Sequence, residues 1–244
     1  MRSAIGGNGS EMQAEIHSDS QAVAHAAAEV IAADARRCIA ERGCFNLAVS
    51  GGDTPGMMLR VLADTSVPWE GVHIFQVDER VAPPGDPARN LTQLRECLLA
   101  HVSLRPEQVH AMPVEHADLA AAARSYSAVL CANAGTPPVL DLVHLGLGVD
   151  GHTASLVPGD PSLKVLDAEV TLAGPYQGRR RMTLTFPAID RARRVLWVVT
   201  GAGKAAMLKR LQAGDRTIPA GRVQQDRAIL LVDRAAGMPA HTEQ

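Results

Sequence analysis

The sequence lacks the features typical of membrane-spanning and nucleic-acid-binding proteins. Its formal net charge is only −2 over 244 residues, so no basic field favours nucleic acid or an anionic membrane surface. The longest apolar runs, such as residues 195–200, are far too short to cross a bilayer, and the first twenty residues contain no hydrophobic signal segment. These absences predict a cytoplasmic protein whose partners are small molecules. The oligomeric state stays open, with a monomer slightly favoured.

Cysteine is scarce, and its spacing excludes two further classes. The four cysteines form no C-x-x-C pair, which indicates reduced thiols rather than a disulfide framework or a zinc site. No metal site is therefore expected. The sequence also has no G-x-S-x-G motif, so a serine hydrolase with a nucleophile elbow is not supported.

Apolar strand-like runs alternate with helical patterns along the whole chain. With 46% hydrophobic residues, the chain can bury a sizeable core. Strands are predicted at 45–50, 72–78, 140–147, 195–201 and 228–233, and helices at 20–42, from 55, 91–102, 117–131 and 203–211. This alternation predicts one α/β domain over residues 1–244: a Rossmann-like, mostly parallel sheet with helices on both faces, preceded by a mobile tail at 1–14.

Two segments depart from this simple alternation. The threonine-rich segment 169–186, "EVTLAGPYQGRRRMTLTF", predicts an antiparallel ribbon or a sheet edge. After the central strand, Gly146, Gly148 and Gly151 spell G-x-G-x-x-G, a weak match to a dinucleotide fingerprint. Pro158 stops any helix that opens there within about two turns, and Asp150 would repel a pyrophosphate, so nicotinamide binding is disfavoured.

The same central strand leads into the most informative motif, "GVDGHTAS". Ligands of open parallel sheets collect at the carboxyl ends of the strands. His152 stands there as a candidate base, and Asp150 can fix its tautomer. A histidine at the start of a helix is more often structural, and the neighbouring carboxylate is what favours catalysis. His144, within the strand, is interpreted as a core residue.

Two other strand ends carry candidate binding residues. In "SGGDTP", the backbone of Gly51 and Gly52 and the Thr54 hydroxyl suit a phosphate at a helix N-terminus, although a plain turn is an equal alternative and Asp53 opposes an anion. "VDERVAPPGDPARN" places Asp78 and Arg80 after the second strand, where they form either a substrate wall or an exposed salt-bridged rim.

Two cations elsewhere in the chain are candidate phosphate ligands. Arg181 precedes the alternating segment "RMTLTF", and Lys204 lies in "TGAGKAAML" at another strand-to-helix turn. The alternatives are a solvated run of arginines and a surface lysine on a helix.

Taken together and in this order, the blocks "SGGDTP", "DERVAPPGDPARN", "HLGLGVDGHTASLVPG", "RMTLTFPAI" and "TGAGKA" resemble the 6-phosphogluconolactonase family. The resemblance covers residues 49–232. It implies the fold shared with glucosamine-6-phosphate deaminases and ribose-5-phosphate isomerases, no metal and no organic cofactor, and a sugar-phosphate lactone as substrate. It also implies that His152, oriented by Asp150, activates a water, with Arg80 holding either the oxyanion or the phosphate.

A sugar-phosphate deaminase or isomerase of the same superfamily is the alternative, and the deaminase branch is the nearer of the two. It resembles this chain at the glycine turn, at Asp-Glu and at Asp-Gly-His, but it carries a ring-opening glutamate where this chain has Val157, and a tyrosine where it has Arg80. Both differences favour the lactonase. Asp53 departs from the uncharged residue that many lactonases carry, which puts its side chain in doubt as a phosphate ligand.

Overall fold

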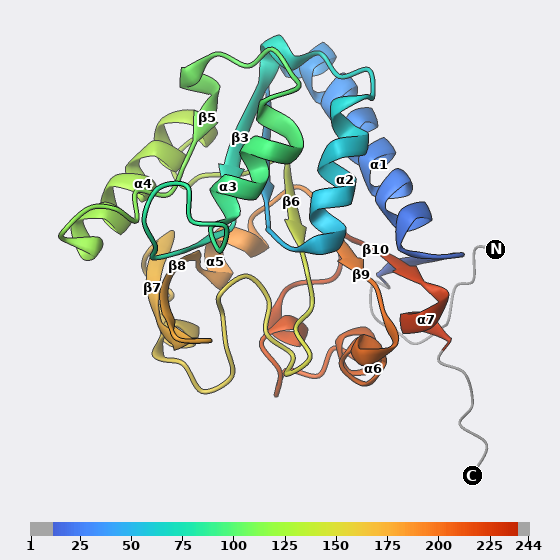
Figure 1. Cartoon of the computed structure of the whole chain (residues 1–244). Coiled ribbons are helices and arrows are strands. Elements are labelled where there is room, and N and C mark those ends of the chain that lie inside the picture. Colours follow the sequence, from blue (N-terminus) through green and yellow to red (C-terminus); the bar gives the residue numbers. More distant parts are fainter. Residues whose placement is uncertain (1–11, 239–244) are drawn as a thin grey trace.

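The computed structural model describes residues 12–238 and contains a seven-stranded sheet in which every pair of neighbouring strands is parallel (Figure 1). The strands, in spatial order, are β1 (Gln13–His17), β10 (Ala228–Asp233), β9 (Val195–Val199), β6 (Leu142–Leu145), β2 (Phe45–Val49), β3 (Val72–Gln76) and β5 (Val109–His110). The three central strands β9, β6 and β2 are buried at every residue. Their near-continuous apolar sequence is typical of parallel strands covered on both faces.

Helices cover both faces of this sheet, as the sequence predicts. One face packs against α1 (Ser20–Arg42), α2 (Asp53–Ala63) and α3 (Asn90–Leu94), which continues as a π-helical turn to Leu99. The other face packs against α4 (Leu119–Ala134), α5 (Phe186–Asp190), α6 (Ala205–Gln212) and α7 (Arg234–Gly237). Alternate residues of each strand point to opposite faces, so Leu47 joins the first core and Ala48 the second.

A second, three-stranded sheet supplies the antiparallel ribbon that the sequence predicts. Its strands, in order, are β4 (Asp78–Arg80), β8 (Arg179–Leu184) and β7 (Val170–Tyr176), with both pairs antiparallel. The predicted strand 72–78 is therefore two strands. Val77 joins them, because its N–H donates to Val49 O of the main sheet and its carbonyl accepts from Leu184 N of the small one.

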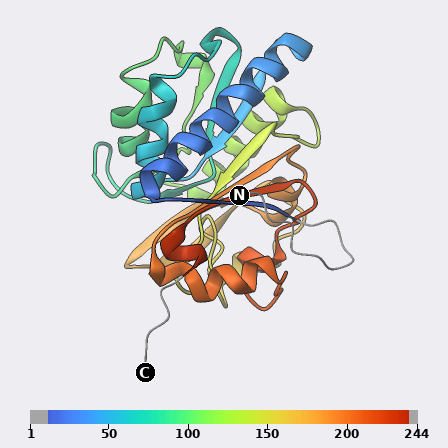
Figure 2. The ribbon, with the colours of Figure 1, turned by 90° about the vertical axis from the view of Figure 1, so that its right-hand side faces the viewer.

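Two further predictions need correction: the one for the N-terminal tail and the one for the segment after Gly151. Gln13 and Ala14, assigned to a terminal tail, belong to β1 and pair with β10, and Met12 packs against the core; residues 1–11 of that predicted tail lie outside the described residues. Figure 2 shows β1 alongside β10. The short helix expected after Gly151 does not form. Gly151 (φ 85°) and Ala154 (φ 51°) are left-handed, which a right-handed helix cannot accommodate, and the segment folds as turns.

Candidate active site

Four loops meet at the carboxyl ends of the adjacent strands β9, β6, β2 and β3. Along the chain, β2 continues outward to β3 and β5, whereas β6 continues in the opposite direction to β9 and β10. The boundary between β6 and β2 is therefore a topological switch point, where open α/β sheets bind ligands. A cavity of about 330 Å³ lies there. Of the predicted site residues, those lining it are Gly51, Thr54, Asp78, Arg80, His152, Arg181 and Lys204.

His152 lines this cavity and forms a hydrogen-bonded pair with Asp150, which does not line it. Nδ1 of the imidazole lies 2.6 Å from Oδ1 of Asp150, which also accepts the His152 backbone N–H at 3.1 Å. Burial alone would raise the pKa of Asp150, but the hydrogen bonds from His152 outweigh it and lower that pKa. The ionised carboxylate fixes the tautomer with the proton on Nδ1. Nε2 is then the nitrogen that can accept a proton.

The glycines of the loop make room for this pair rather than for a dinucleotide. A Cβ on Gly148 would lie 2.0 Å from Nδ1 of His152, so only glycine allows the observed ring position. Gly151 has φ +85°, and a Cβ there would lie 2.7 Å from Ile218. Both positions therefore require glycine for reasons of space or backbone conformation.

Three cations reach the cavity from different elements: Arg80 from β4, Arg181 from β8 and Lys204 from the turn before α6. Burial lowers the pKa of Arg181, and the positive charge of Arg80 lowers it further. Burial likewise lowers the pKa of Lys204. Desolvated cations gathered around one cavity favour an anionic ligand, because the anion compensates for the hydration that burial removed.

The glycine turn contributes a helix N-terminus to the same cavity. Gly52 caps α2 without a side-chain hydrogen bond to the first turn, and the first residues of the helix, Asp53, Thr54 and Pro55, line the cavity. Gly52 itself is placed differently from its prediction: its N–H donates to Gln93 Oε1 at 2.8 Å, and it does not line the cavity. The Thr54 hydroxyl lies 2.6 Å from that of Thr200. Asp53 is exposed at the rim.

Asn90 connects the glycine turn with the loop after β3. Its side-chain oxygen accepts from Arg80 Nη1 at 2.6 Å, and its amide donates to the carbonyl of Asp78 at 2.8 Å and to the carboxylate at 3.1 Å. A Cβ on Gly51 would lie 2.0 Å from this Asn90 oxygen. Gly51 is therefore required by the close approach of Asn90.

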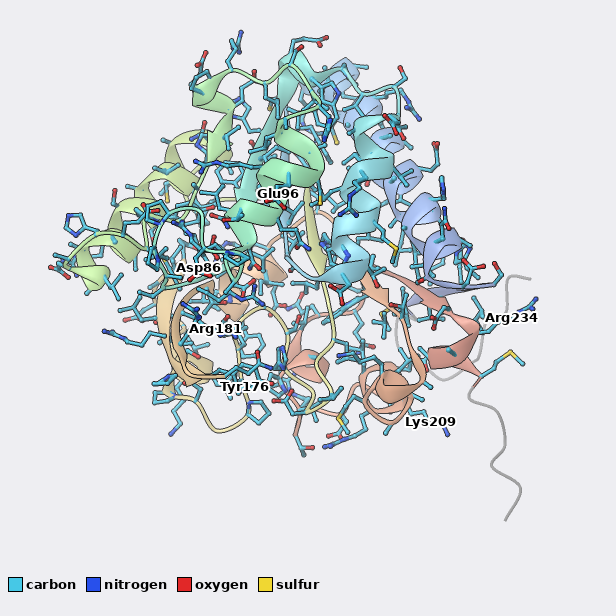
Figure 3. All side chains as sticks on the ribbon, viewed as in Figure 1. Asp86, Glu96, Tyr176, Arg181, Lys209 and Arg234 are labelled. Carbon is cyan, nitrogen blue, oxygen red and sulfur yellow. The ribbon has the colours of Figure 1, made fainter. Side chains whose placement is uncertain are left out.

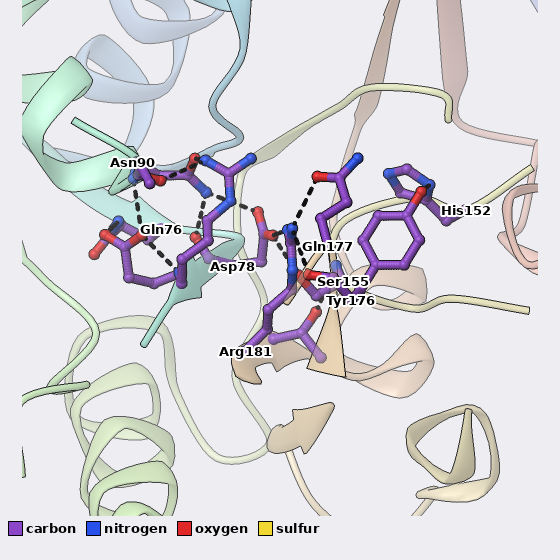
Figure 4. A network of polar contacts seen from close by, with 12 residues as sticks. Gln76, Asp78, Asn90, His152, Ser155, Tyr176, Gln177 and Arg181 are labelled. Carbon is purple, nitrogen blue, oxygen red and sulfur yellow. Dashed lines mark hydrogen bonds and ion pairs between the residues drawn. The ribbon is translucent and has the colours of Figure 1, made fainter. Parts of the chain in front are cut away.

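The carboxylate of Asp78 is buried and already engaged. It accepts from the Ser155 hydroxyl at 2.6 Å and lies 4.0 Å from Arg181 Nη1 (Figure 4). The neighbouring Glu79 is fully buried and accepts from the backbone N–H groups of Arg80, Asn90 and Leu91. Glu79 thus holds the loop in shape, and the charged segment is a built wall rather than an exposed rim.

Sequence reasoning missed two residues at this site. Thr200 directly follows β9 and lines the cavity. The Tyr176 hydroxyl lies 3.4 Å from Nδ1 of His152, and its ring meets the imidazole edge-on at 5.0 Å. A threonine at a strand end was a detectable signal, whereas nothing local marks Tyr176. His144, by contrast, is a fully buried core residue as predicted, and burial lowers its pKa to about 4.

Within residues 12–238, no group of three or more His, Cys, Asp or Glu side chains is arranged to hold a metal ion. In the same range, no helix combines the length and the apolar character needed to span a bilayer. The site of the described chain includes the histidine–aspartate pair, the three cations, the α2 N-terminus and the polar groups around Asn90.

Fold and site together define a parallel α/β protein with a hydrogen-bonded histidine–aspartate pair and a cation-lined cavity at the sheet's switch point. A sequence model of the family described as glucosamine-6-phosphate isomerases/6-phosphogluconolactonase matches residues 18–231, and the chain belongs to that family.

Individual relatives agree with this assignment. The chain is 39% identical to a 6-phosphogluconolactonase of Synechocystis, over 82% of this chain and 87% of the relative. It is 37% identical to that of Mycobacterium tuberculosis, over 93% and 98%. The solved 6-phosphogluconolactonase of Trypanosoma brucei superposes with a TM-score of 0.84 at 25% identity, over 93% of this chain and 98% of that one.

Proposed function

We propose that the chain hydrolyses 6-phospho-D-glucono-1,5-lactone to 6-phosphogluconate, the lactonase step of the oxidative pentose phosphate pathway. The observation that carries the proposal is the His152–Asp150 pair opening on a cavity with three cations. A lactone carbonyl is already electrophilic, so the reaction needs an activated water and a grip on the phosphate, and no cofactor. The names of the relatives support the same substrate.

His152 acts as general base in the proposed mechanism. Nε2 removes a proton from water as the water oxygen attacks C1 of the lactone, while Asp150 stabilises the imidazolium through Nδ1. The tetrahedral intermediate then collapses, the bond from C1 to the ring oxygen breaks, and the imidazolium returns the proton to that oxygen. Water is consumed, the ring opens to the carboxylic acid, and the base is restored.

The phosphate supplies remote binding energy. Arg181 and Lys204 lie at the cavity together with Thr54 and the start of α2, and charge-assisted hydrogen bonds from such groups are the strong ones. Arg80 adds positive charge at the same cavity, on the side fixed by Asn90. Asp78, engaged by Ser155 and Asn90, is suited to position Arg181 or to accept a sugar hydroxyl.

The decisive experiment measures lactone hydrolysis against its uncatalysed background. We expect His152→Asn to lower kcat by ~10²–10⁴-fold with KM and folding little changed. The matched control is His25→Asn, because His25 is exposed on α1, away from the cavity. Near-normal kcat in His152→Asn would end the assignment of the base.

The deaminase alternative is tested with the same proteins. Val157 cannot transfer a proton and does not line the cavity, so we expect no ammonia release from glucosamine-6-phosphate. Turnover of that substrate at a rate comparable to lactone hydrolysis would assign the chain to the other branch of the family.

A further inference from the structure

Tyr176 ends β7 at a point where the ribbon is irregular. Ala173 pairs with Arg181 and Tyr176 with Arg179, so β7 carries one extra residue between these two pairs. Such a bulge re-aims the side chains that follow it, and bulges are frequent beside active sites. This one is pinned by Asp160, whose carboxylate accepts the Gly174 N–H at 2.8 Å. The irregularity turns Tyr176 toward the cavity wall.

The hairpin turn after Tyr176 is well defined. Gln177 (φ 52°) and Gly178 (φ 76°) are both left-handed, the pattern of a two-residue turn whose twist matches the strands. Arg181 Nη2 donates to the carbonyl of Tyr176 at 3.3 Å and to Gln177 Oε1 at 3.4 Å. The turn thus fixes Arg181 relative to Tyr176, and Figure 3 shows the two side by side.

The Tyr176 side chain touches both parts of the site. Its hydroxyl and ring meet His152, and the Arg181 guanidinium lies 5.1 Å from the centre of its ring (Figure 4). Burial raises the pKa of Tyr176, and the charge and hydrogen bonding of Asp150 raise it further. The phenol therefore stays protonated, and its O–H can donate a hydrogen bond to the Asp150 carboxylate.

We propose that Tyr176 is a positioning residue that acts through two neighbours. Its hydroxyl orients the His152–Asp150 pair, and its ring supports Arg181. The inference rests on the lactonase proposed above and deepens it: one aromatic side chain aligns the base with the cation that is to bind the phosphate. Tyr176 does not line the cavity itself, so it acts on substrate only through these groups.

The two roles are separated by two substitutions. Tyr176→Phe removes only the hydroxyl, and we expect kcat to fall about 2- to 12-fold, the range for one net hydrogen bond, with KM unchanged. Tyr176→Leu also removes the ring, and we expect an additional rise in KM of about 2- to 5-fold for the phosphorylated lactone, the range for an exposed cation–π contact. An unchanged KM in Tyr176→Leu would overturn the role of the ring.

The pH dependence distinguishes positioning from mere structure. Besides Asp150 itself, the charged groups near the His152–Asp150 pair and Tyr176 are Lys204 and Arg181, and Tyr176→Phe leaves all three in place. Without the phenol, Asp150 holds the protonated imidazole more tightly. The acidic limb of the kcat profile should therefore move to higher pH by about 0.5–1 unit.

The chain offers a matched control, since Tyr126 is its only other tyrosine. Its hydroxyl is buried against Gln76 and His110, away from the cavity. Tyr126→Phe should lower the melting temperature without moving the acidic limb. An acidic limb that superposes on the parent in Tyr176→Phe, or that moves equally in Tyr126→Phe, would overturn the inference.

A second measurement works without substrate. The His152 ring signals, followed by NMR across pH, should titrate at a higher pH in Tyr176→Phe than in the parent. Identical titrations would refute the positioning role even if the parent proved inactive on the lactone. Absence of lactone hydrolysis in the parent, together with a shifted titration, would instead refute the proposed function and leave the positioning of His152 supported.

Discussion

Replacing Gly148 by alanine tests whether catalysis depends on the ring position of His152. The new Cβ would lie 2.0 Å from Nδ1, whereas ordinary contacts of this kind are about 3.5 Å, so the ring must move by about 1.5 Å. The 2.6 Å hydrogen bond to Asp150 cannot survive this displacement. Because a misplacement of 1 Å can cost about 10²-fold in rate, we expect kcat to fall by about 10²-fold or more.

The assay is kcat at saturating lactone, together with thermal unfolding and the NMR titration of His152. The matched control is Gly203→Ala: Gly203 is exposed, does not line the cavity, and a Cβ there meets nothing within 4 Å. We expect near-parental kcat in the control. A Gly148→Ala protein with parental kcat would refute the view that the His152–Asp150 geometry is catalytic, whereas an unfolded protein would be identified by its melting curve.

Three further predictions concern charge. Lys204→Ala should lower kcat/KM about 10- to 150-fold for the phosphorylated lactone only; equal losses for gluconolactone would remove Lys204 from the phosphate site. Burial lowers the pKa of His144 to about 4, so between about pH 6.5 and 4 only the unfolded state binds a proton at this residue. The free energy of unfolding should therefore fall by about 3 kcal/mol as pH drops through this range, and urea unfolding of His144→Gln should depend less on pH. Glu79→Gln should lower the free energy of unfolding by about 3–5 kcal/mol, since it breaks a buried ionic network around Arg89; a loss below about 1 kcal/mol in urea unfolding would contradict this role.

Periodicity and turn residues predicted the parts of the fold that depend on local sequence. The buried strands β2, β6 and β9 are continuous apolar runs, and the glycine turns after them mark the strand-to-helix junctions. β1 escaped prediction because it is an edge strand with partly exposed residues and no apolar run. β4 escaped because the change of sheet at Val77 depends on partners about 30 residues before and 100 residues after it, Val49 and Leu184.

The residues of the candidate site divide in the same way, into those that local sequence marks and those that distant partners position. His152, Asp150 and Arg80 could be found because each follows a predicted strand at the same edge of the sheet. Tyr176 could not, because its direction is set by a bulge and by pairing with β8. The partner of the Gly52 N–H could not be foreseen for a related reason: a glycine turn indicates free N–H groups, but the Gln93 side chain that accepts this one lies 41 residues further along the chain.

The charge arrangement of the cavity supports a phosphorylated ligand over a neutral sugar. Arg181 and Lys204 are both desolvated enough for burial to lower their pKa values, which is unfavourable unless an anion compensates for the lost water. Asp78 compensates only in part, since it lies 4.0 Å from Arg181 and is shared with Ser155 and Asn90. Asp150 is engaged by His152. In the function proposed above, a phosphate dianion would supply the missing counter-charge, and its binding energy would hold the lactone carbonyl against the activated water.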